Sequence, residues 1–278
     1  MHMGNARGGA LGDCLAAVLD KAGYNVWREF YVNDAGNQIE KFGCSLEARY
    51  LQIFKGDEIE FPEDGYQGED IKDLAKEYAD LNGDSLVNVS AEERKKVLVD
   101  YALPKNIKKM QADMEKYKIF YDKWFFESEL HKSGAVKAVV DLLTKKGLTY
   151  EKDGAVWYKN KEVLTQKLLK EGKSQKYIDN LELKDDVLIR QNGNPTYFTA
   201  DIAYHKNKFD RGFTTLIDVW GADHHGHVMR MKGAMDAIGY DGDKLNVVLM
   251  QLVKLVKDGE LVRMSKRTGK AIQLGDLL

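Results

Sequence analysis

The alternation of strand and helix patterns in the last third of the chain constrains the fold most strongly. TTLIDVWGAD (214–223) is typical of a buried strand, and it leads directly into HHGHVMRMKGAMDAIG (224–239), a helix expected to end near Gly239. LNVVLMQLV (245–253) then predicts a long apolar strand. This strand–helix–strand order favours an α/β fold with a parallel sheet, in which ligands bind at the carboxyl ends of the strands.

The beginning of the chain shows the same alternation of helix and strand patterns. Apolar residues at helical spacing predict a helix over 7–22, and Gly23 is placed to end it. YNVWREFYVN (24–33) has the aromatic and β-branched content of a strand, and the turn-rich NDAGNQ after it can start a helix that runs to about residue 54. Two later elements are also predicted, a strand at DVLIRQ (186–191) and a helix at TYFTADIAYHKNKF (196–209).

The block between these α/β segments, about 56–184, is mostly helical. Helices are predicted at 71–83, at 90–103 behind a capping box of Ser90 and Glu93, and at 106–125. LTYEKDGAVWYKN (148–160) predicts a hairpin around Asp153-Gly154. We therefore expect an inserted block of helices and one small hairpin at 56–184, with 1–55 and 185–278 as the two halves of one α/β domain.

Composition excludes several classes of protein. The formal net charge of the 278 residues is −2, so binding to nucleic acid would need a local basic face. Two cysteines, Cys14 and Cys44, make a disulfide framework unexpected and favour the cytoplasm. The apolar run at 245–253 is far too short to span a membrane, so we expect no membrane association.

A histidine cluster is the first candidate for chemistry. Four of the six histidines lie within 205–227, three of them in DHHGH (223–227). His224 and His227 would share one helix face and Asp223 could add an oxygen ligand, yet the segment matches no zinc signature, and we expect no metal. Two other interpretations stay open: a polar helix start capped by histidines, and histidine donors that face a phosphate at the helix N-terminus.

A basic loop near the C-terminus is the second candidate. VRMSKRTGKA (262–271) follows a predicted turn at Asp258-Gly259, and it holds four cations. A run of charge is usually a solvated surface. Cations spaced by small residues can also fold over a polyphosphate, with lysine as a mobile charge and arginine as a bidentate fork.

The first residues, MHMGNARGGALGD (1–13), are the third candidate. A Met-His start is common in cloning remnants and needs no functional explanation. The glycines that follow permit close approach of the backbone to a ligand or to neighbouring elements, and the helix behind them presents its N-terminus to that ligand. These glycines are Gly4, Gly8, Gly9 and Gly12.

The three candidates, taken in order, resemble the signatures of class I aminoacyl-tRNA synthetases. In that family a His-x-Gly-His element and a Lys-Met-Ser-Lys-Ser element bracket ATP; here HMGNAR and RMSKR stand in their places, with DHHGH between them. Longer stretches, such as DVLIRQNGNPTYFTADIAYHKNKFDRGF and LIDVWGADHHGHVMRMKGAM, are similar to bacterial arginyl-tRNA synthetases in particular. The resemblance is weakest at about 56–120. It implies a Rossmann-like nucleotide-binding domain with the helical block as an insertion.

The resemblance also implies an ATP site. His2 and Asn5 fall on signature positions that bond the ATP phosphates, and Lys266 falls on the lysine that holds the leaving pyrophosphate. Asn5 replaces the usual second histidine, and Arg267 stands where the final serine is usual, so a role for that hydroxyl is not expected. The remaining ATP-binding residues expected on this basis are Gly4, His227, Arg263, Met264 and Ser265. Mg²⁺ is expected to neutralise phosphate charge.

An arginine pocket is implied on the predicted helix 196–209. A guanidinium presents five donors in a planar fork and calls for a carboxylate. Tyr197 and Asp201 are four residues apart and hence on one helix face. By resemblance these two residues line the amino-acid pocket, with His224 at a further position.

The expected function is ligation of arginine to tRNA(Arg) with ATP, by a catalytic core that lacks the family's N-terminal tRNA-binding and C-terminal anticodon-binding domains. The full-length protein is expected to be a monomer. An acidic residue and an asparagine that help to hold arginine in the family would precede Met1, so activity of the chain alone is not expected. Three alternatives stay open: a paralogue or inactive fragment that binds nucleotide or tRNA, a small-molecule nucleotidyltransferase, and a metal-dependent hydrolase.

Overall fold

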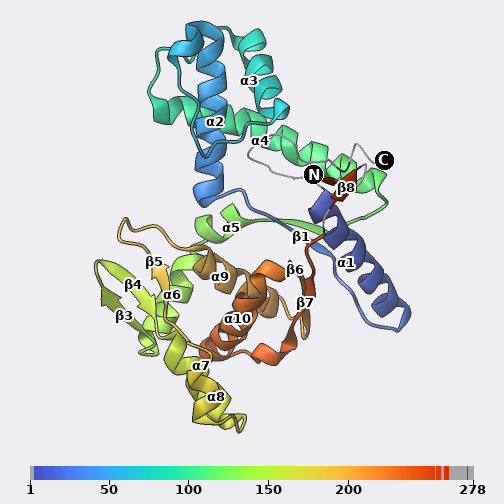
Figure 1. The fold of residues 1–278 in the computed structure, drawn as a ribbon, viewed down its shortest axis with the longest axis vertical. Helices are drawn as coiled ribbons and strands as arrows, with labels where there is room; N and C mark the ends of the chain where they lie inside the picture. Colours follow the sequence, from blue (N-terminus) through green and yellow to red (C-terminus); the bar gives the residue numbers. More distant parts are fainter. Residues whose placement is uncertain (1–2, 254, 258–259, 263–273, 275–278) are drawn as a thin grey trace. The chain divides into compact units, whose positions relative to one another are not determined.

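The computed structural model describes residues 3–253, 255–257, 260–262 and 274 (Figure 1). The chain divides into two compact units, one formed by Met1–Phe125 with Val253–Leu278 and the other by Phe126–Leu252. The first unit contains α1 (Met3–Lys21), β1 (Glu29–Val32), α2 (Gly36–Lys55), α3 (Glu69–Asn82), α4 (Ala91–Lys116), β2 (Lys123–Phe126), β8 (Leu255–Lys257) and β9 (Glu260–Val262).

The glycine-rich start of the chain is helical from Met3 onward. α1 packs on a small core in which Ala6, Met114, Ile119 and Leu274 are buried. Gly9 permits this packing, because a Cβ atom there would lie 3.3 Å from the Tyr121 hydroxyl. The predicted close approach of glycine backbone to a neighbouring element is confirmed at this position.

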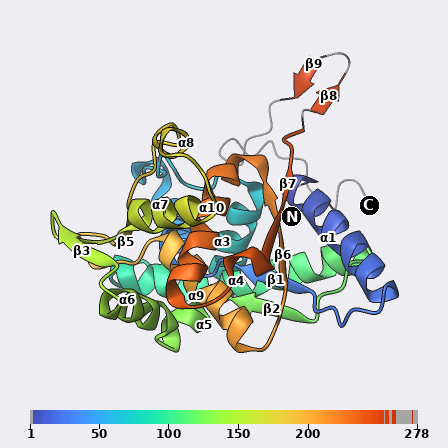
Figure 2. The ribbon, with the colours of Figure 1, turned by 90° about the horizontal axis from the view of Figure 1, so that it is seen from below.

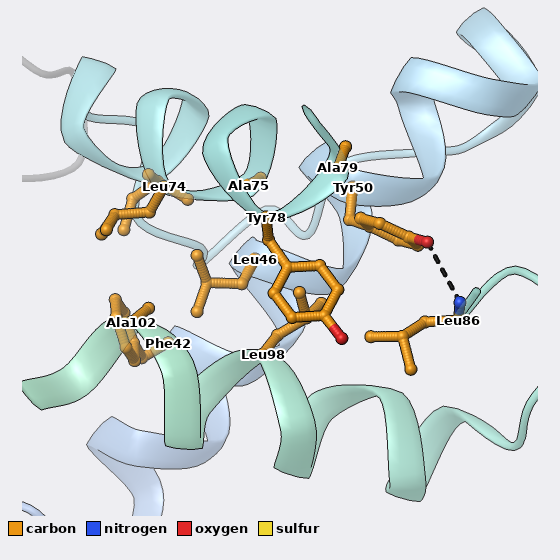
Figure 3. Packing of buried hydrophobic residues seen from close by; sticks show 11 residues of the cluster. Phe42, Leu46, Tyr50, Leu74, Ala75, Tyr78, Ala79, Leu86, Leu98 and Ala102 are labelled. Atoms are coloured by element: carbon orange, nitrogen blue, oxygen red, sulfur yellow. Dashed lines mark hydrogen bonds between the residues drawn. The ribbon is translucent and has the colours of Figure 1, made fainter. Parts of the chain in front are cut away.

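Three helices form the main core of the first unit. α2, α3 and α4 pack together around Leu46, Tyr50 and Leu98, each at most 1% exposed (Figure 3). The Tyr50 hydroxyl donates to the Gly83 carbonyl at 2.8 Å and accepts from the Leu86 backbone nitrogen at 3.1 Å. This buried hydroxyl therefore fixes the loop between α3 and α4 to α2.

α4 corrects two predictions for residues 90–125. The two expected helices are one, which begins behind Ser90, whose side chain accepts from the Glu93 backbone nitrogen, and continues through Pro104 to Lys116. Proline cannot donate a backbone hydrogen bond, but packing offsets this loss, because α4 buries residues in a core on each side of Pro104. The expected helix also ends too late: residues 123–126 form β2, which pairs with β1, and only a partner strand distant in sequence decides this.

The second unit carries a helical layer and two small sheets. It contains α5 (Glu127–Lys132), α6 (Ala135–Lys145), β3 (Thr149–Lys152), β4 (Ala155–Tyr158), α7 (Asn160–Lys170), α8 (Gln175–Asp179), β5 (Asp186–Ile189), α9 (Tyr197–Asp210), β6 (Leu216–Gly221), α10 (His225–Ile238) and β7 (Leu245–Met250). α10 lies along α7 and α9, and α6 packs on α9 (Figure 2).

The two sheets of this unit follow the sequence predictions closely. β3 and β4 form the expected antiparallel hairpin, in which Asp153 and Gly154 adopt the left-handed backbone that such a two-residue turn requires. β5 adds to β4 as a third strand. β6 and β7 pair in parallel, from Leu216 opposite Leu245 to Gly221 opposite Met250.

Several strands are shorter than predicted, among them β5 (Asp186–Ile189 of the expected 186–191) and β6 (Leu216–Gly221 of the expected 214–223). β1 covers only Glu29–Val32 of the expected 24–33, and the long strand expected from residue 245 ends at Met250, with β8 starting at Leu255. The turn expected at Asp258-Gly259 lies outside the described residues. Within the described part of the chain, no helix is both long and apolar enough to cross a membrane.

Tyr50→Phe tests the main core of the first unit. The change removes the hydroxyl, which leaves the buried Leu86 amide without its partner and breaks the bond to the Gly83 carbonyl, so we expect the free energy of unfolding to fall by about 1–3 kcal/mol. Urea denaturation followed by circular dichroism measures the change. Tyr24→Phe, at a tyrosine that is 64% exposed, is the matched control and should change stability by less than about 0.5 kcal/mol. Equal effects of the two variants would contradict the assigned role of Tyr50.

Candidate active site

Polar side chains gather where β6 ends in the second unit. β6 leads through a short 3-10 turn (Ala222–His224) into α10, and it lies parallel to β7, so the carboxyl ends of both strands point the same way. The sequence predicts a strand that leads directly into a helix here; the structure has both, with the 3-10 turn between them and α10 starting at His225. The carboxyl end of a parallel strand followed by a helix N-terminus is a usual position for a ligand site in α/β proteins.

α9 brings a second set of side chains to this place. Its first turn is tied to β5, because the Thr196 hydroxyl donates to the Val187 carbonyl and the Thr199 hydroxyl donates to the Leu188 carbonyl, each at 2.7 Å. Tyr197 is the first residue of α9 and is 41% exposed. The start of α9 is thus held at a fixed position on the antiparallel sheet.

Asp201 and His227 meet between α9 and α10. The His227 Nε2 atom lies 3.1 Å from Asp201 Oδ2. The Asp201 carboxylate is 32% exposed, whereas the His227 ring is 17% exposed. A carboxylate held on one side by a histidine and open on the other can accept hydrogen bonds from a cationic ligand.

Two aromatic rings fix the orientation of His227. Phe198 contacts it edge to face at a centroid distance of 5.5 Å, and Trp220 contacts it at 5.4 Å. Phe198 is buried on α9, and Trp220 lies near the end of β6. The ring, which lies on α10, therefore packs against two other elements, α9 and β6, and its Nε2 atom is directed at Asp201.

A second ion pair, which no sequence pattern predicted, lies beside this pair. Arg230 donates from Nε to Asp186 at 3.1 Å and from Nη2 to the other carboxylate oxygen, and its guanidinium lies 5.0 Å from the centroid of Phe198. Burial raises the pKa of Asp186, although the Arg230 charge opposes this rise. The pair joins β5 to α10 next to His227.

A buried carboxylate lies deeper between α9 and β6. Asp218 contacts Lys208 Nζ at 2.9 Å and His205 Nε2 at 2.5 Å, and its side chain is only 10% exposed. Burial by itself would raise the pKa of Asp218, but the charges and hydrogen bonds of these two neighbours outweigh burial and hold the pKa well below its usual range. A charged residue inside the apolar strand TTLIDVWG was the one sequence signal that could have found this cluster.

His224 is placed differently from His227. Its side chain is 61% exposed, its Nε2 atom lies 3.8 Å from Asp223, and its ring lies 6.3 Å from that of Trp220. Among the residues that the structure describes, no group of three or more histidine, cysteine or acidic side chains is arranged to hold a metal ion. His224 therefore lies beside Trp220, as His227 does, but its side chain is far more exposed than that of His227.

The residues expected on the ATP side are only partly described. Gly4 and Asn5 lie in the first turn of α1, in the first unit, and Asn5 is exposed there. Apart from His227, which lies on α10, the other expected residues lie outside the described part of the chain; these are His2, Arg263, Met264, Ser265 and Lys266. Their roles, and those of Tyr197, Asp201, His224 and His227, stay predictions.

Comparison with known proteins supplies the family. The model for "tRNA synthetases class I (R), catalytic domain" matches residues 1–278. Curated relatives named arginine–tRNA ligase, from Ruminiclostridium cellulolyticum and Caldanaerobacter subterraneus subsp. tengcongensis, are 58% and 59% identical over the whole chain. The chain spans about half the length of the curated relatives it matches, 47% and 46% for these two.

Solved structures agree with this match. A Campylobacter jejuni protein assigned as an arginyl tRNA synthetase is 36% identical with a TM-score of 0.81, over the whole chain and 56% of its own length. Thermus thermophilus arginyl-tRNA synthetase gives a TM-score of 0.65 over the whole chain and 49% of its own length, and at 19% identity it shows a shared fold. The predicted α/β fold class of the Rossmann-like synthetase type is confirmed.

Asp218→Asn tests the buried carboxylate. Because its pKa is lower in the folded than in the unfolded protein, Asp218 stabilises the fold at neutral pH; this contribution begins to decline as the pH falls below about 4, the unfolded value, and is lost as the pH falls through the lower folded pKa. We expect the free energy of unfolding of the variant at pH 7 to be about 3 kcal/mol lower than that of the unaltered protein, and this difference to become smaller in acid. Urea titrations between pH 3 and 7 measure it.

The control for this experiment is Asp141→Asn. Asp141 also pairs with a lysine, Lys137, but its side chain is 59% exposed. Its loss should change the free energy of unfolding by less than about 1 kcal/mol at any of these pH values. A deficit in Asp218→Asn that is constant with pH would contradict the assigned ionisation.

Proposed function

We propose that this chain, which belongs to the family of class I tRNA synthetase catalytic domains specific for arginine, activates arginine with ATP and transfers it to tRNA(Arg). The observation that carries the proposal is the Asp201 carboxylate, oriented by His227 and open to solvent at the end of the α/β sheet. The 58% identity to a relative named arginine–tRNA ligase supports it.

Recognition of arginine follows from the chemistry of the site. A guanidinium keeps its charge at any physiological pH and offers paired donors, which fit a carboxylate better than any neutral acceptor does. Asp201 supplies that carboxylate, and Tyr197, one helical turn earlier and partly exposed, borders the same face of α9. His224 borders the opening from the start of α10.

The ATP side of the proposal rests on the two family signatures. His2 and Asn5 donate to the phosphates, and Gly4 between them lets the backbone approach. Lys266 holds the pyrophosphate that leaves, within a loop that also contributes Arg263, Met264 and Ser265, while His227 lies on the ATP side of the arginine pocket. Mg²⁺ accompanies the phosphates of ATP and neutralises part of their charge.

The reaction needs no covalent nucleophile from the protein. An oxygen of the arginine carboxylate attacks the α-phosphorus of ATP, the bond to the β-phosphate oxygen breaks, and pyrophosphate leaves. A hydroxyl of the terminal ribose of tRNA then attacks the carbonyl carbon of arginyl-adenylate, and AMP leaves. The residues named act by positioning the reactants and by stabilising the charge that develops on phosphate oxygens.

The setting of the proposed activity is the cytoplasm, with the full-length protein a monomer. The helical block at 56–184 remains an insertion of unassigned role, and its boundaries stay predictions. A paralogue that only binds nucleotide or tRNA would share the fold but would not exchange pyrophosphate into ATP in the presence of arginine. A small-molecule nucleotidyltransferase would exchange it with another substrate.

Asp201→Asn tests the arginine pocket. The amide keeps the size of the side chain but removes the charge that pairs with guanidinium, so we expect kcat/KM for arginine in ATP–pyrophosphate exchange to fall at least about 100-fold. The assay uses the full product of the gene, with and without tRNA. Asp210→Asn, at the other end of α9 and paired with Lys206, is the control and should stay within about twofold. Exchange that depends on another amino acid and not on arginine would contradict the proposal.

Lys266→Ala tests the phosphate side. If Lys266 stabilises the leaving pyrophosphate, the variant should lose at least about 100-fold in kcat for exchange, with little change in the KM for arginine. Lys257→Ala, nine residues earlier and outside both signatures, is the control. A fully active Lys266→Ala protein would refute the mechanism, whatever the result for Asp201.

A further inference from the structure

His205 is a buried polar residue that the proposed function does not use. It lies on α9 one helical turn after Asp201, and its side chain is 2% exposed. A buried imidazole requires hydrogen-bond partners, since an unpaired polar group costs about 1–3 kcal/mol in a protein interior. The partners of His205 therefore show what its ring does in the fold.

Both ring nitrogens of His205 face acceptor oxygens. Nδ1 lies 2.7 Å from the backbone carbonyl oxygen of Asp201, and Nε2 lies 2.5 Å from Oδ2 of Asp218. A carbonyl oxygen can only accept, and the Asp218 carboxylate accepts when it is ionised. A ring with hydrogen on both nitrogens satisfies both partners at once, so His205 joins the backbone of Asp201 to a charge on β6.

Lys208 makes the second contact to the same carboxylate. Its Nζ atom donates to Asp218 Oδ1 at 2.9 Å and lies 4.2 Å from the centroid of the Tyr204 ring. The two oxygens of Asp218 are thus taken by two different residues of α9. Only one of these, His205, also contacts Asp201. Variants of His205 and of Lys208 can therefore be compared to distinguish an effect on the arginine pocket from an effect on the packing of α9.

Trp220 connects this cluster to His227. The indole lies on β6 two residues after Asp218, and its ring contacts His205 at a centroid distance of 6.3 Å and His227 at 5.4 Å. His227 in turn bonds the carboxylate of Asp201. Asp201 is therefore connected to this cluster at two points. Its backbone carbonyl contacts His205, which contacts Trp220; Trp220 contacts His227, which bonds the Asp201 carboxylate.

We propose that His205 is a positioning residue. Through its contacts with the Asp201 carbonyl and with Asp218 on β6, it holds the Asp201 carboxylate and the His227 ring in the relative position that binds a guanidinium. This proposal rests on the proposed function of the same site. It predicts that a defect at His205 appears in the use of arginine and not in the use of ATP. If His205 only filled the core, its replacement would lower stability and would leave the KM for arginine and the KM for ATP unchanged.

His205→Gln and Lys208→Met separate the two roles. Glutamine can still donate to Asp218 but loses the bond to the Asp201 carbonyl, whereas Lys208→Met removes the other bond to Asp218 and leaves Asp201 untouched. In arginine-dependent ATP–pyrophosphate exchange with the full product of the gene, we expect His205→Gln to raise the KM for arginine about tenfold, with the KM for ATP within about twofold. Lys208→Met should lower the melting temperature and leave the KM for arginine within about twofold.

The outcomes distinguish the two proposals. If the unaltered protein exchanges pyrophosphate with arginine but folded His205→Gln keeps the same KM for arginine, or Lys208→Met raises it equally, the positioning role is overturned and the function stands. If the unaltered protein shows no arginine-dependent exchange, the proposed function fails and this role fails with it.

A measurement on the unaltered protein covers the case in which His205→Gln does not fold. A neutron crystal structure locates the hydrogens of the ring directly. Hydrogen on both nitrogens, directed at the Asp201 carbonyl and at Asp218, supports the proposal. A ring whose Nδ1 atom carries no hydrogen, or does not face the Asp201 carbonyl, overturns it.

Discussion

The Asp218 carboxylate is a charge placed in the interior of the second unit, and the arrangement of α9 and β6 depends on how that charge is compensated. Two side chains of α9, His205 and Lys208, supply the compensation. If the helix rotated or moved along the strand, both contacts would break. An unpaired charge at this depth would cost several kcal/mol, so the two contacts hold the helix in place on the strand. Asp201 lies on the same helix, and of the two compensating residues His205 is the one that also contacts its backbone.

The local parts of the fold were predictable because short-range chemistry decides them. The hairpin follows from Asp153-Gly154, and α10 ends at Gly239 in the left-handed backbone that glycine adopts at little cost. The errors lie where distant contacts decide. Residues 123–126 form β2 because they pair with β1, and α4 passes Pro104 because residues on the two sides of the proline are buried in separate cores.

The candidate site was predictable to the extent that its residues carry a family signature. Tyr197, Asp201, His224 and His227 were named from the sequence, and the structure brings Asp201 and His227 into contact while His224 stays exposed. The supporting residues were missed. In the sequence His205 and Arg230 look like ordinary members of amphipathic helices, and only their partners on β6 and β5, Asp218 and Asp186, give them a role.

The binding of arginine by Asp201 can be seen directly in a crystal structure of the full product of the gene with arginine bound. We expect the guanidinium to donate to the Asp201 carboxylate, with His227 still bonded to that carboxylate and Tyr197 beside the ligand. An arginine whose guanidinium pairs with another acidic residue, with Asp201 facing solvent or making no contact with the ligand, would contradict it.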